Sequence, residues 1–221
     1  RQAVPKNKVV VHPLEYAGEK AEDKLVRVRK ALRAKHADGM LMASLDDIAW
    51  TLNMRGSDVH CNPVFVSYLL ISMAKVTLFV DNDKLTAEAE VYLRNLGVEV
   101  REYSDVASAL GKYPDYSILI DPNEINYTLA NAVKCNSVIR DVSPVPLLKC
   151  IKNSTEIEGF RRAMIRDGVA MVKFLHWLVP AVENGGVTEM SVDAKLTALR
   201  EEQELCRGLS FDTIAAYQDH G

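Results

Sequence analysis

The stretch FVSYLLISMAKVTLFV, residues 65–80, sets the architecture of this chain. Its β-branched and aromatic residues favour extended strands. Ser67, Ser72 and Lys75 interrupt it before it reaches the length of about 20 apolar residues that a membrane-spanning helix requires. A short turn around Met73 separates two apolar runs of strand length. We therefore predict a β-hairpin inside a soluble domain, with no membrane attachment.

The segments before this hairpin alternate between helical and extended patterns. Residues 21–34 place apolar side chains three and four positions apart, which gives a helix one apolar stripe. The run GMLMAS, residues 39–44, has the length of a strand. Residues 45–53, LDDIAWTLN, follow Ser44 as a helix start and precede Gly56 as a stop signal. These patterns predict a helix, a strand and a second helix.

Helices and strands also alternate after the hairpin. Residues 84–97 have helical spacing and end at Gly97, a residue type common just beyond helix C-termini. The next patterns are strand, helix, strand, helix and strand over residues 98–103, 105–110, 117–121, 123–133 and 137–140. Such alternation beside a hairpin predicts an α/β fold with a mixed sheet flanked by helices.

The pattern changes at DVSPVPLLKCIKN, residues 141–153. Pro144 and Pro146 interrupt regular structure there, and the chain beyond this stretch is almost entirely helical in pattern. We predict a domain boundary at this point, which gives one domain of residues 1–145 and a second of residues 146–221.

Two helices and a strand are predicted in the second domain. The helices cover residues 154–179 and 188–204, and the strand is LSFDTIAAY, residues 209–217. Apolar side chains between Ile157 and Leu178 line one face of the first helix. A complete domain would bury this face, whereas a truncated domain would expose it and favour association with a second copy.

Composition excludes several classes of function. The formal net charge is −3, and Lys and Arg are scattered, so the chain lacks the basic patch of a nucleic-acid-binding protein. The four cysteines form no CxxC pair, which disfavours zinc and disulfide frameworks and favours the reducing cytoplasm. The chain begins with Arg1, and its first residues up to Pro13 have the pattern of an extended linker. We expect both ends to continue into a larger protein.

The loop LNMRGSDVHCNPVF, residues 52–65, concentrates reactive side chains. His60 and Cys61 are adjacent, and neighbours on an extended chain point to opposite faces, so His60 is poorly placed to activate Cys61 as a nucleophile. Asp58 and His60 offer two ligands, whereas catalytic metals usually take three or more from the protein, and no further ligand follows at a suitable spacing. We therefore assign no catalytic and no metal-ligating residue in this chain.

A structural role explains the same loop. Gly56 lets the chain reverse, and Asn62 precedes Pro63 in a pairing typical of turns. Arg55 can bridge Asp58 or backbone carbonyls. The alternative is a binding role, in which Arg55, Asp58 and Asn62 face a cleft formed with a neighbouring domain.

Other titratable residues give weaker signals. His12, His36 and His176 occur singly, which is more typical of core or rim residues than of ligands. The pair Asp46 and Asp47 is explained by the favourable effect of acids in the first turn of a helix.

Two sequence blocks resemble one known family. The block SLDDIAWTLNMRGSDVHCNPVFVSY, residues 44–68, resembles the Xaa-Pro aminopeptidases, also called aminopeptidase P. A second block, IKNSTEIEGFRRAMIRDGVAMVKFLHWL, residues 151–178, is similar to the first helix of that family's catalytic domain. The RGSDVHCNPVF loop distinguishes this branch from prolidase and creatinase, and the resemblance covers essentially the whole chain.

The resemblance implies a larger protein of three domains. Residues 1–145 then correspond to the second of two creatinase-like α/β domains, and residues 146–221 to the opening, mainly helical part of a catalytic domain with the pita-bread fold. The implied parent hydrolyses proline-containing peptides, removing an N-terminal residue that precedes proline, with two manganese ions. From the cysteines we expect a cytoplasmic protein, and from the apolar face between Ile157 and Leu178 we expect a dimer or another homo-oligomer.

The resemblance also implies what this chain lacks. The family's metal ligands, two aspartates, a histidine and two glutamates, lie later in the catalytic domain, so we expect the chain alone to bind no catalytic metal pair and to be inactive. His220 stands where the family usually has asparagine, and no role is transferred to it. The alternative is a non-catalytic module of the same fold that binds peptides or proteins.

Overall fold

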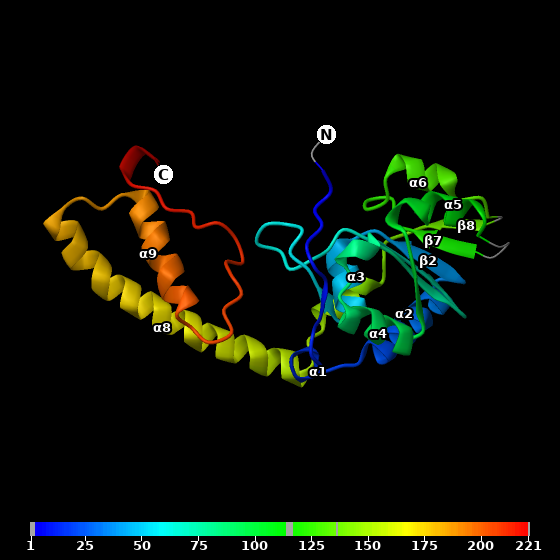
Figure 1. The fold of residues 1–221 in the computed structure, drawn as a ribbon, viewed down its shortest axis with the longest axis horizontal. Coiled ribbons are helices and arrows are strands. Elements are labelled where there is room, and N and C mark those ends of the chain that lie inside the picture. Colours follow the sequence, from blue (N-terminus) through cyan, green and yellow to red (C-terminus); the bar gives the residue numbers. More distant parts are fainter. Residues whose placement is uncertain (1–2, 114–116, 136, 221) are drawn as a thin grey trace. The chain divides into compact units, whose positions relative to one another are not determined.

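The chain forms two compact units in a computed structural model that describes residues 3–113, 117–135 and 137–220. The first unit contains Arg1–Val59 and Pro63–Asn153, and the second contains His60–Asn62 and Ser154–Gly221. Figure 1 labels the main helices and strands.

The first unit has an α/β architecture. Its strands are β1 (Val10–Val11), β2 (Gly39–Met42), β3 (Met54–Arg55), β4 (Tyr68–Ser72), β5 (Val76–Phe79), β6 (Val98–Arg101), β7 (Ser117–Ile120) and β8 (Ser137–Arg140). Its α-helices are α1 (Leu14–Ala17), α2 (Ala21–Ala34), α3 (Leu45–Thr51), α4 (Ala87–Asn95), α5 (Val106–Gly111), α6 (Tyr127–Ala132) and α7 (Val145–Cys150). Two short 3₁₀ helices, Asn82–Lys84 and Tyr103–Asp105, precede α4 and α5.

The described strands form a mixed sheet around the predicted hairpin. The order in the six-stranded sheet is β6-β5-β4-β2-β7-β8. β4 pairs antiparallel with both β5 and β2, whereas β5–β6, β2–β7 and β7–β8 are parallel pairs. Tyr68 lies opposite Phe79 and Ile71 lies opposite Val76, so the hairpin has the position predicted from residues 65–80. The predicted α/β fold with a mixed sheet flanked by helices is confirmed.

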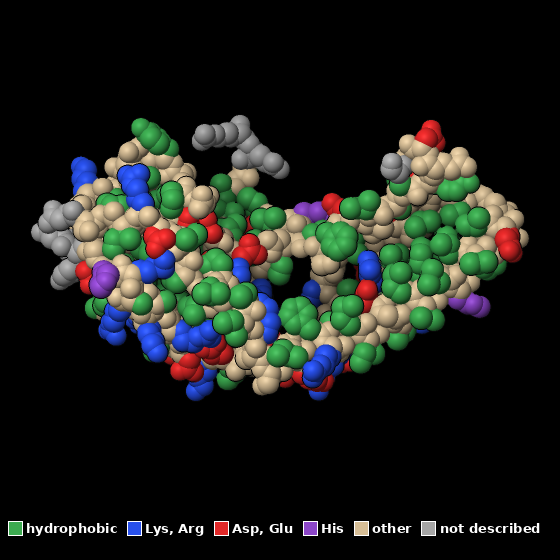
Figure 2. Space-filling model, turned by 180° about the vertical axis from the view of Figure 1, so that it is seen from behind, with side chains coloured by type: hydrophobic (Ala, Val, Ile, Leu, Met, Phe, Trp, Pro, Cys, Tyr) green, Lys and Arg blue, Asp and Glu red, His purple; other side chains and the backbone are tan. Residues whose placement is uncertain are grey.

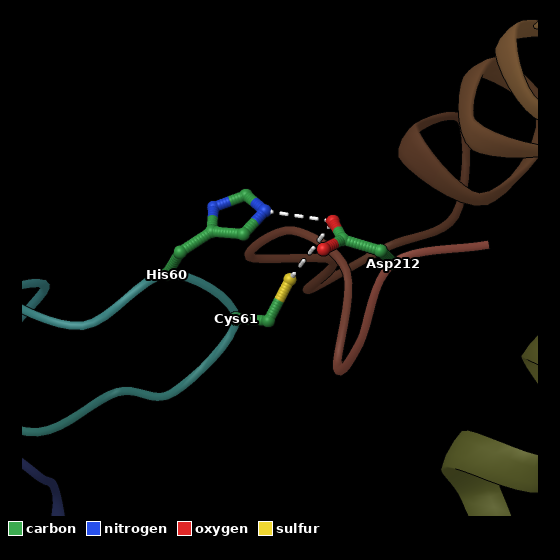
Figure 3. Close-up of side chains that lie close together, drawn as sticks. All are labelled: His60, Cys61 and Asp212. Atoms are coloured by element: carbon green, nitrogen blue, oxygen red, sulfur yellow. Dashed lines mark hydrogen bonds and ion pairs between the residues drawn. The ribbon is translucent and has the colours of Figure 1, made fainter.

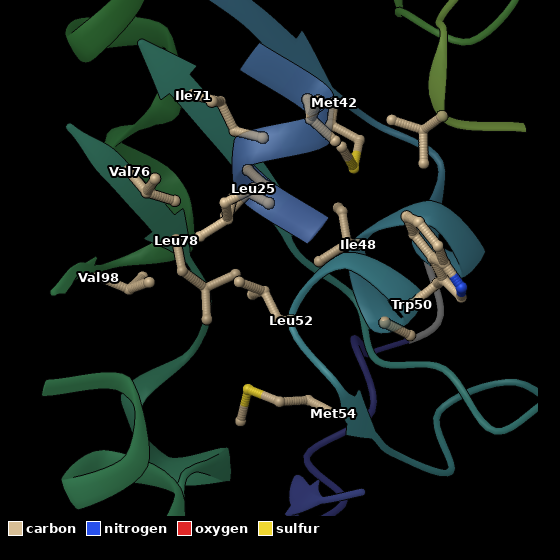
Figure 4. Packing of buried hydrophobic residues seen from close by; sticks show 14 of the residues in the cluster. Leu25, Met42, Ile48, Trp50, Leu52, Met54, Ile71, Val76, Leu78 and Val98 are labelled. Carbon is tan, nitrogen blue, oxygen red and sulfur yellow. The ribbon is translucent and has the colours of Figure 1, made fainter. Parts of the chain in front are cut away.

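Helices cover both faces of this sheet because successive strand residues point to opposite sides. Met40 and Met42 of β2 belong to a core that also contains residues of α2, α3 and α4 (Figure 4). Leu41, between them, belongs to a second core with residues of α5 and α6. Burying a side chain such as Leu78, which has no exposed surface, contributes roughly 1.5–3 kcal/mol.

The helices of the first unit follow their predicted patterns closely. The stripe of Leu25, Val28 and Leu32 on α2 is buried, as its spacing indicates. On α4, the Thr86 side chain accepts a hydrogen bond from the Ala89 amide at 3.1 Å and caps the N-terminus. Both helices therefore begin and end within a few residues of their predicted limits.

Two expectations for the N-terminal half are wrong. The first residues are not a free linker, because β1 pairs with β3 and Val9 is fully buried beside Leu85. Ser44 is the N-cap of α3, as predicted, but its side chain makes no capping hydrogen bond, and α3 ends at Thr51 without reaching the predicted stop signal at Gly56. Tertiary pairing and burial outweigh the local signals in both places.

The prolines near residue 145 begin a helix instead of interrupting structure. Pro144 is the N-cap of α7 and Pro146 lies in its first turn, where a missing amide hydrogen is no loss. Val145 is fully buried in the first unit. The division between the compact units therefore falls after Asn153, beyond the predicted boundary, while the assignment of the two segments to parent domains stays a prediction.

The second unit consists mainly of α8 (Ser154–Asn184) and α9 (Glu189–Glu201), with a 3₁₀ turn at Gln218–His220. Its small core contains Ala170 and Phe174 of α8 with Leu196 and Leu199 of α9. The strand predicted over residues 209–217 is absent: among the described residues this segment pairs with no other strand. A strand needs a partner for its backbone groups, and local composition does not supply one.

Hydrophobic side chains along α8 are exposed. Nine large hydrophobic side chains on this helix are between 41% and 69% exposed: Ile157, Phe160, Met164, Ile165, Val169, Val172, Leu175, Val179 and Val182. Figure 2 shows hydrophobic side chains gathered over the elongated helical part of the molecule. Within the described ranges, no helix combines the length and apolar composition needed to cross a membrane.

A substitution of Gly39 gives a test of how tightly the start of β2 is packed. A Cβ atom there would lie 2.2 Å from the Tyr113 hydroxyl oxygen and 2.6 Å from the Ile71 carbonyl oxygen. Gly39→Ala should therefore lower the free energy of unfolding by about 1–3 kcal/mol, measured by urea denaturation. Gly111→Ala is the control, because its Cβ meets only the Ala132 carbonyl oxygen, at 3.8 Å, and it should not be destabilising. Equal effects of the two substitutions would contradict this account.

Candidate functional site

The loop of residues 52–65 connects α3 and β3 to the central strand β4. Its two arms pair through backbone hydrogen bonds, from the Gly56 amide to the Pro63 carbonyl at 3.2 Å and from the Asp58 amide to the Val64 carbonyl at 3.1 Å. A Cβ on Gly56 would lie 2.7 Å from the Cβ of buried Phe65. Gly56 therefore permits a close approach of the two arms of the loop.

Asp58 is the buried anchor of this loop. Its carboxylate forms an ion pair with Lys84, and neither side chain has any exposed surface. The same carboxylate accepts a hydrogen bond from the Val66 amide at 2.7 Å. Lys84 lies in the 3₁₀ turn before α4, 26 residues away, and no spacing in the sequence indicates the pairing. This contact supports the structural interpretation of Asp58.

Arg55 binds backbone carbonyls, the second of its two predicted roles. Its Nη1 donates to the Ala49 carbonyl at 3.0 Å and to the Met54 carbonyl at 2.9 Å. Burial, together with the charges of Arg55 and Lys24, lowers the pKa of His12 to about 4. His12 is therefore neutral at neutral pH, which fits a packing residue.

Asp46 and Asp47 both lie in the first turn of α3, as predicted, and Asp47 also forms a contact with another helix. Asp47 is 1% exposed and its Oδ1 accepts a bond from Lys149 Nζ at 2.6 Å. Burial raises the pKa of Asp47 although Lys149 opposes this shift. Asp47 therefore joins α3 to α7, in addition to its place in the first turn of α3. Charge alone could not reveal a partner 102 residues away.

A shallow hollow lies on the side of the sheet that α5 and α6 cover. It is lined by Tyr68, Tyr103, Asn126 and Tyr127 among other residues. The rings of Tyr68 and Tyr103 stack with centroids 5.3 Å apart, and the Asn126 amide donates to the Tyr68 hydroxyl at 3.1 Å. Burial and Tyr68 raise the pKa of Tyr103, so its hydroxyl stays protonated. These groups can form hydrogen bonds with a ligand.

The tip of the loop brings three possible ligands together (Figure 3). His60 Nε2 lies 2.8 Å from Asp212 Oδ1, and Cys61 Sγ lies 4.0 Å from the same oxygen. Cys61 has a φ of 57°, so the backbone is left-handed there and the premise that the two neighbours point to opposite faces is wrong. His60 and Cys61 instead reach one acceptor, which lies 152 residues from His60 in sequence.

This grouping does not form an activated cysteine. Burial, followed by the charge of Asp212, raises the pKa of the Cys61 thiol. Nucleophilic cysteines need the opposite shift. The His60 and Asp212 side chains are 79% and 78% exposed, so solvent screens their interaction. The three side chains are therefore better suited to bind a metal ion than to act as a catalytic triad.

The first unit is an α/β domain with a mixed sheet between two layers of helices. Comparison with known protein families identifies the family to which this domain belongs. The chain belongs to the creatinase/prolidase N-terminal domain family, whose profile matches residues 1–156. It is 38% identical over 223 residues to Xaa-Pro aminopeptidase 1 of Dictyostelium discoideum, with 98% of this chain covered. It is 37% identical over 221 residues to Xaa-Pro aminopeptidase ApepP of Drosophila melanogaster. The resemblance predicted from residues 44–68 and 151–178 is confirmed.

A solved structure shows the same relationship. The X-prolyl aminopeptidase of Caenorhabditis elegans, described as a cytosolic enzyme with a di-nuclear active site, superposes with a TM-score of 0.92 at 32% identity over 98% of this chain. The Xaa-Pro dipeptidase of Bacillus anthracis, at 18% identity and a TM-score of 0.62, shares the fold alone. This chain spans 35% and 36% of the length of the Dictyostelium and Drosophila relatives, and 36% of the C. elegans enzyme.

The described residues do not fit a di-nuclear centre of the kind attributed to the C. elegans enzyme. His60, Cys61 and Asp212 make the single grouping of three His, Cys, Asp or Glu ligand atoms in the described part of the chain. One thiol, one imidazole and one carboxylate cannot supply two ions with three or more protein ligands each. These three residues therefore cannot hold a catalytic metal pair.

The Asp58–Lys84 pair gives a test of how the loop is anchored. Asp58→Asn or Lys84→Met should each lower the free energy of unfolding by about 3–5 kcal/mol, because each leaves one charge buried without its partner. The double variant should lose less than the sum, since it removes both charges. Urea denaturation measures all three. Lys75→Met is the control, because the Lys75–Glu99 pair is exposed and should contribute about 0–1 kcal/mol. Strictly additive losses would contradict a direct pairing.

Proposed function

We propose that this chain is part of an Xaa-Pro aminopeptidase, comprising its second creatinase-like domain and the opening segment of its pita-bread catalytic domain. The observation that supports this proposal best is the 0.92 TM-score to the C. elegans enzyme over 98% of this chain. In this proposal, the parent removes the N-terminal residue that precedes proline in a peptide and uses two manganese ions. A carboxylate-rich ligand set would suit manganese better than softer metals.

The role proposed for this chain is support of the catalytic domain. Two of the loop residues are fixed within the first unit, Asp58 by its ion pair with Lys84 and Arg55 by hydrogen bonds to backbone carbonyls. A loop fixed by buried contacts can present its remaining groups in one conformation. We propose that these three residues shape the loop and take no part in bond cleavage.

A cytoplasmic location completes the proposal. The C. elegans enzyme is described as cytosolic, and this chain is 32% identical to it. The four cysteines are free in the structure, as expected for a reducing compartment. The proposed substrates are proline-containing peptides.

A peptidase assay tests the proposed function. The 221-residue chain should release no N-terminal residue from an Xaa-Pro peptide, with or without added manganese, because its described residues hold no metal pair. The same chain extended through the remainder of its catalytic domain should release it in a manganese-dependent manner. The C. elegans enzyme is the positive control, and cooperative thermal unfolding confirms that the short chain is folded. Metal-dependent release by the short chain, or inactivity of the extended chain, would contradict the proposal.

The exposed face of α8 supports a further proposal, that the chain forms homo-oligomers. Light scattering after gel filtration should give a mass above 24.6 kDa that rises with concentration. The double variant Ile165→Lys, Val172→Glu should be monomeric, because both side chains are about two-thirds exposed and the changes remove the apolar surface without disturbing a core. Val91→Lys, at an exposed position of α4, should leave the mass unchanged. A monomer at high concentration would refute this proposal.

A further inference from the structure

We propose that His60, Cys61 and Asp212 form a binding site for one zinc ion. The site would be separate from the metal pair proposed for the parent enzyme, and it depends on neither the activity nor the oligomeric state proposed above. Its ligands would be His60 Nε2, Cys61 Sγ and a carboxylate oxygen of Asp212, with water in the fourth position.

The distances between the ligand atoms carry the proposal. Zinc bonds of about 2.0–2.3 Å to nitrogen, oxygen and sulfur, in a tetrahedron, place the ligand atoms roughly 3.3–3.6 Å apart. His60 Nε2 is 2.8 Å and Cys61 Sγ is 4.0 Å from Asp212 Oδ1, and all three ligand atoms lie within 4.8 Å of one another. Side-chain movements on the order of 1 Å would therefore give zinc geometry.

The backbone holds two of these ligands in place. Cys61 has a φ of 57°, a conformation that side chains other than glycine, asparagine and aspartate rarely adopt. This conformation directs the Cys61 thiol and the His60 imidazole to one oxygen, as Figure 3 shows. Non-glycine residues in sparsely populated conformations are concentrated at ligand-binding sites. The nearby Asp58–Lys84 pair fixes the base of the loop from which both ligands project.

The chemistry of the three donors selects zinc. Thiolate and imidazole are ligands that zinc prefers, whereas magnesium, calcium and manganese prefer oxygen donors. A thiolate, a carboxylate and a neutral imidazole carry two negative charges, which match one divalent cation. Because His60 and Asp212 are largely exposed, water has access to the remaining coordination position. Three protein ligands and a water are an established zinc arrangement.

A simpler interpretation is a surface ion pair between His60 and Asp212. Such a pair would need no thiol, and exposed pairs contribute little to stability. The Cys61 side chain therefore distinguishes the two interpretations, because it is required for zinc and irrelevant to the ion pair.

The test uses the 221-residue chain freed of metal by a chelator and kept reduced. Cobalt(II), a spectroscopic substitute for zinc, should bind one ion per chain and give both thiolate-to-cobalt charge transfer and the visible bands of tetrahedral cobalt. Zinc should displace the cobalt, protect one thiol from a thiol reagent and release a proton on binding. Competition with a chromophoric chelator gives the zinc affinity.

Matched variants assign the ligands. Cys61→Ser should abolish the charge-transfer band, and Cys61→Ser, His60→Gln and Asp212→Asn should each weaken zinc binding by more than the ~10–100-fold expected for an outer partner of a ligand. The controls are Cys206→Ser, another partly exposed thiol, and His220→Gln, another exposed histidine paired with a carboxylate. Both controls should bind zinc as the unmodified chain does.

The outcomes decide between a site and adventitious binding. One-to-one binding that Cys61→Ser and Asp212→Asn both weaken, and that the controls leave unchanged, supports the proposal. Absence of charge transfer, or zinc binding that is unchanged in Cys61→Ser, would overturn it and leave the ion pair as the explanation. Because no step measures peptide cleavage, failure here would not affect the proposed aminopeptidase function.

Discussion

The first unit depends on the burial of β2 on both faces. All four residues of this strand are buried, and it lies between the antiparallel partner β4 and the parallel partner β7. A strand in this position cannot leave either side open to water, so helices must cover both faces of the sheet. The helices α2, α3 and α4 provide one layer, and α5 and α6 provide the other. The close approach at Gly39 follows from the same crowding.

Buried charges then fix the segments that leave the sheet. Asp58 and Lys84 join the loop after β3 to the turn before α4, and Asp47 and Lys149 join α3 to α7. Pairing of this kind contributes little net stability, because removing the charges from water costs nearly as much as their attraction gains. An arrangement that separates the two partners, however, leaves a charge buried without its counter-ion, which costs free energy. The buried Asp58–Lys84 pair therefore selects one conformation for the loop of residues 52–65, and the Asp47–Lys149 pair, whose lysine is partly exposed, links α3 to the end of the first unit.

The residues that identify the family of this chain are not the residues to which we assign the chemistry of the parent. The creatinase/prolidase profile covers residues 1–156, and the likeness to Xaa-Pro aminopeptidases extends across 98% of the chain. Both comparisons concern the fold of the chain and not a reaction that its residues catalyse. The one three-ligand grouping in the described part of the chain, at His60, Cys61 and Asp212, has a composition unlike that of a carboxylate-bridged metal pair. We therefore propose that the chemistry of the parent lies in residues beyond this chain.

The sequence by itself determined the hairpin, the stripe of Leu25, Val28 and Leu32 on α2, the alternation of helices and strands and the family, because each of these depends on residues close together in the chain. It gave wrong expectations for the N-terminal residues, for Pro144 and Pro146 and for residues 209–217, where the outcome depends on pairing with distant segments. Only the tertiary structure decided which charges meet, since Lys84 is 26 residues from Asp58, Lys149 is 102 residues from Asp47 and Asp212 is 152 residues from His60. Local patterns record which side chains are present, whereas contacts across such separations arise only when the chain folds.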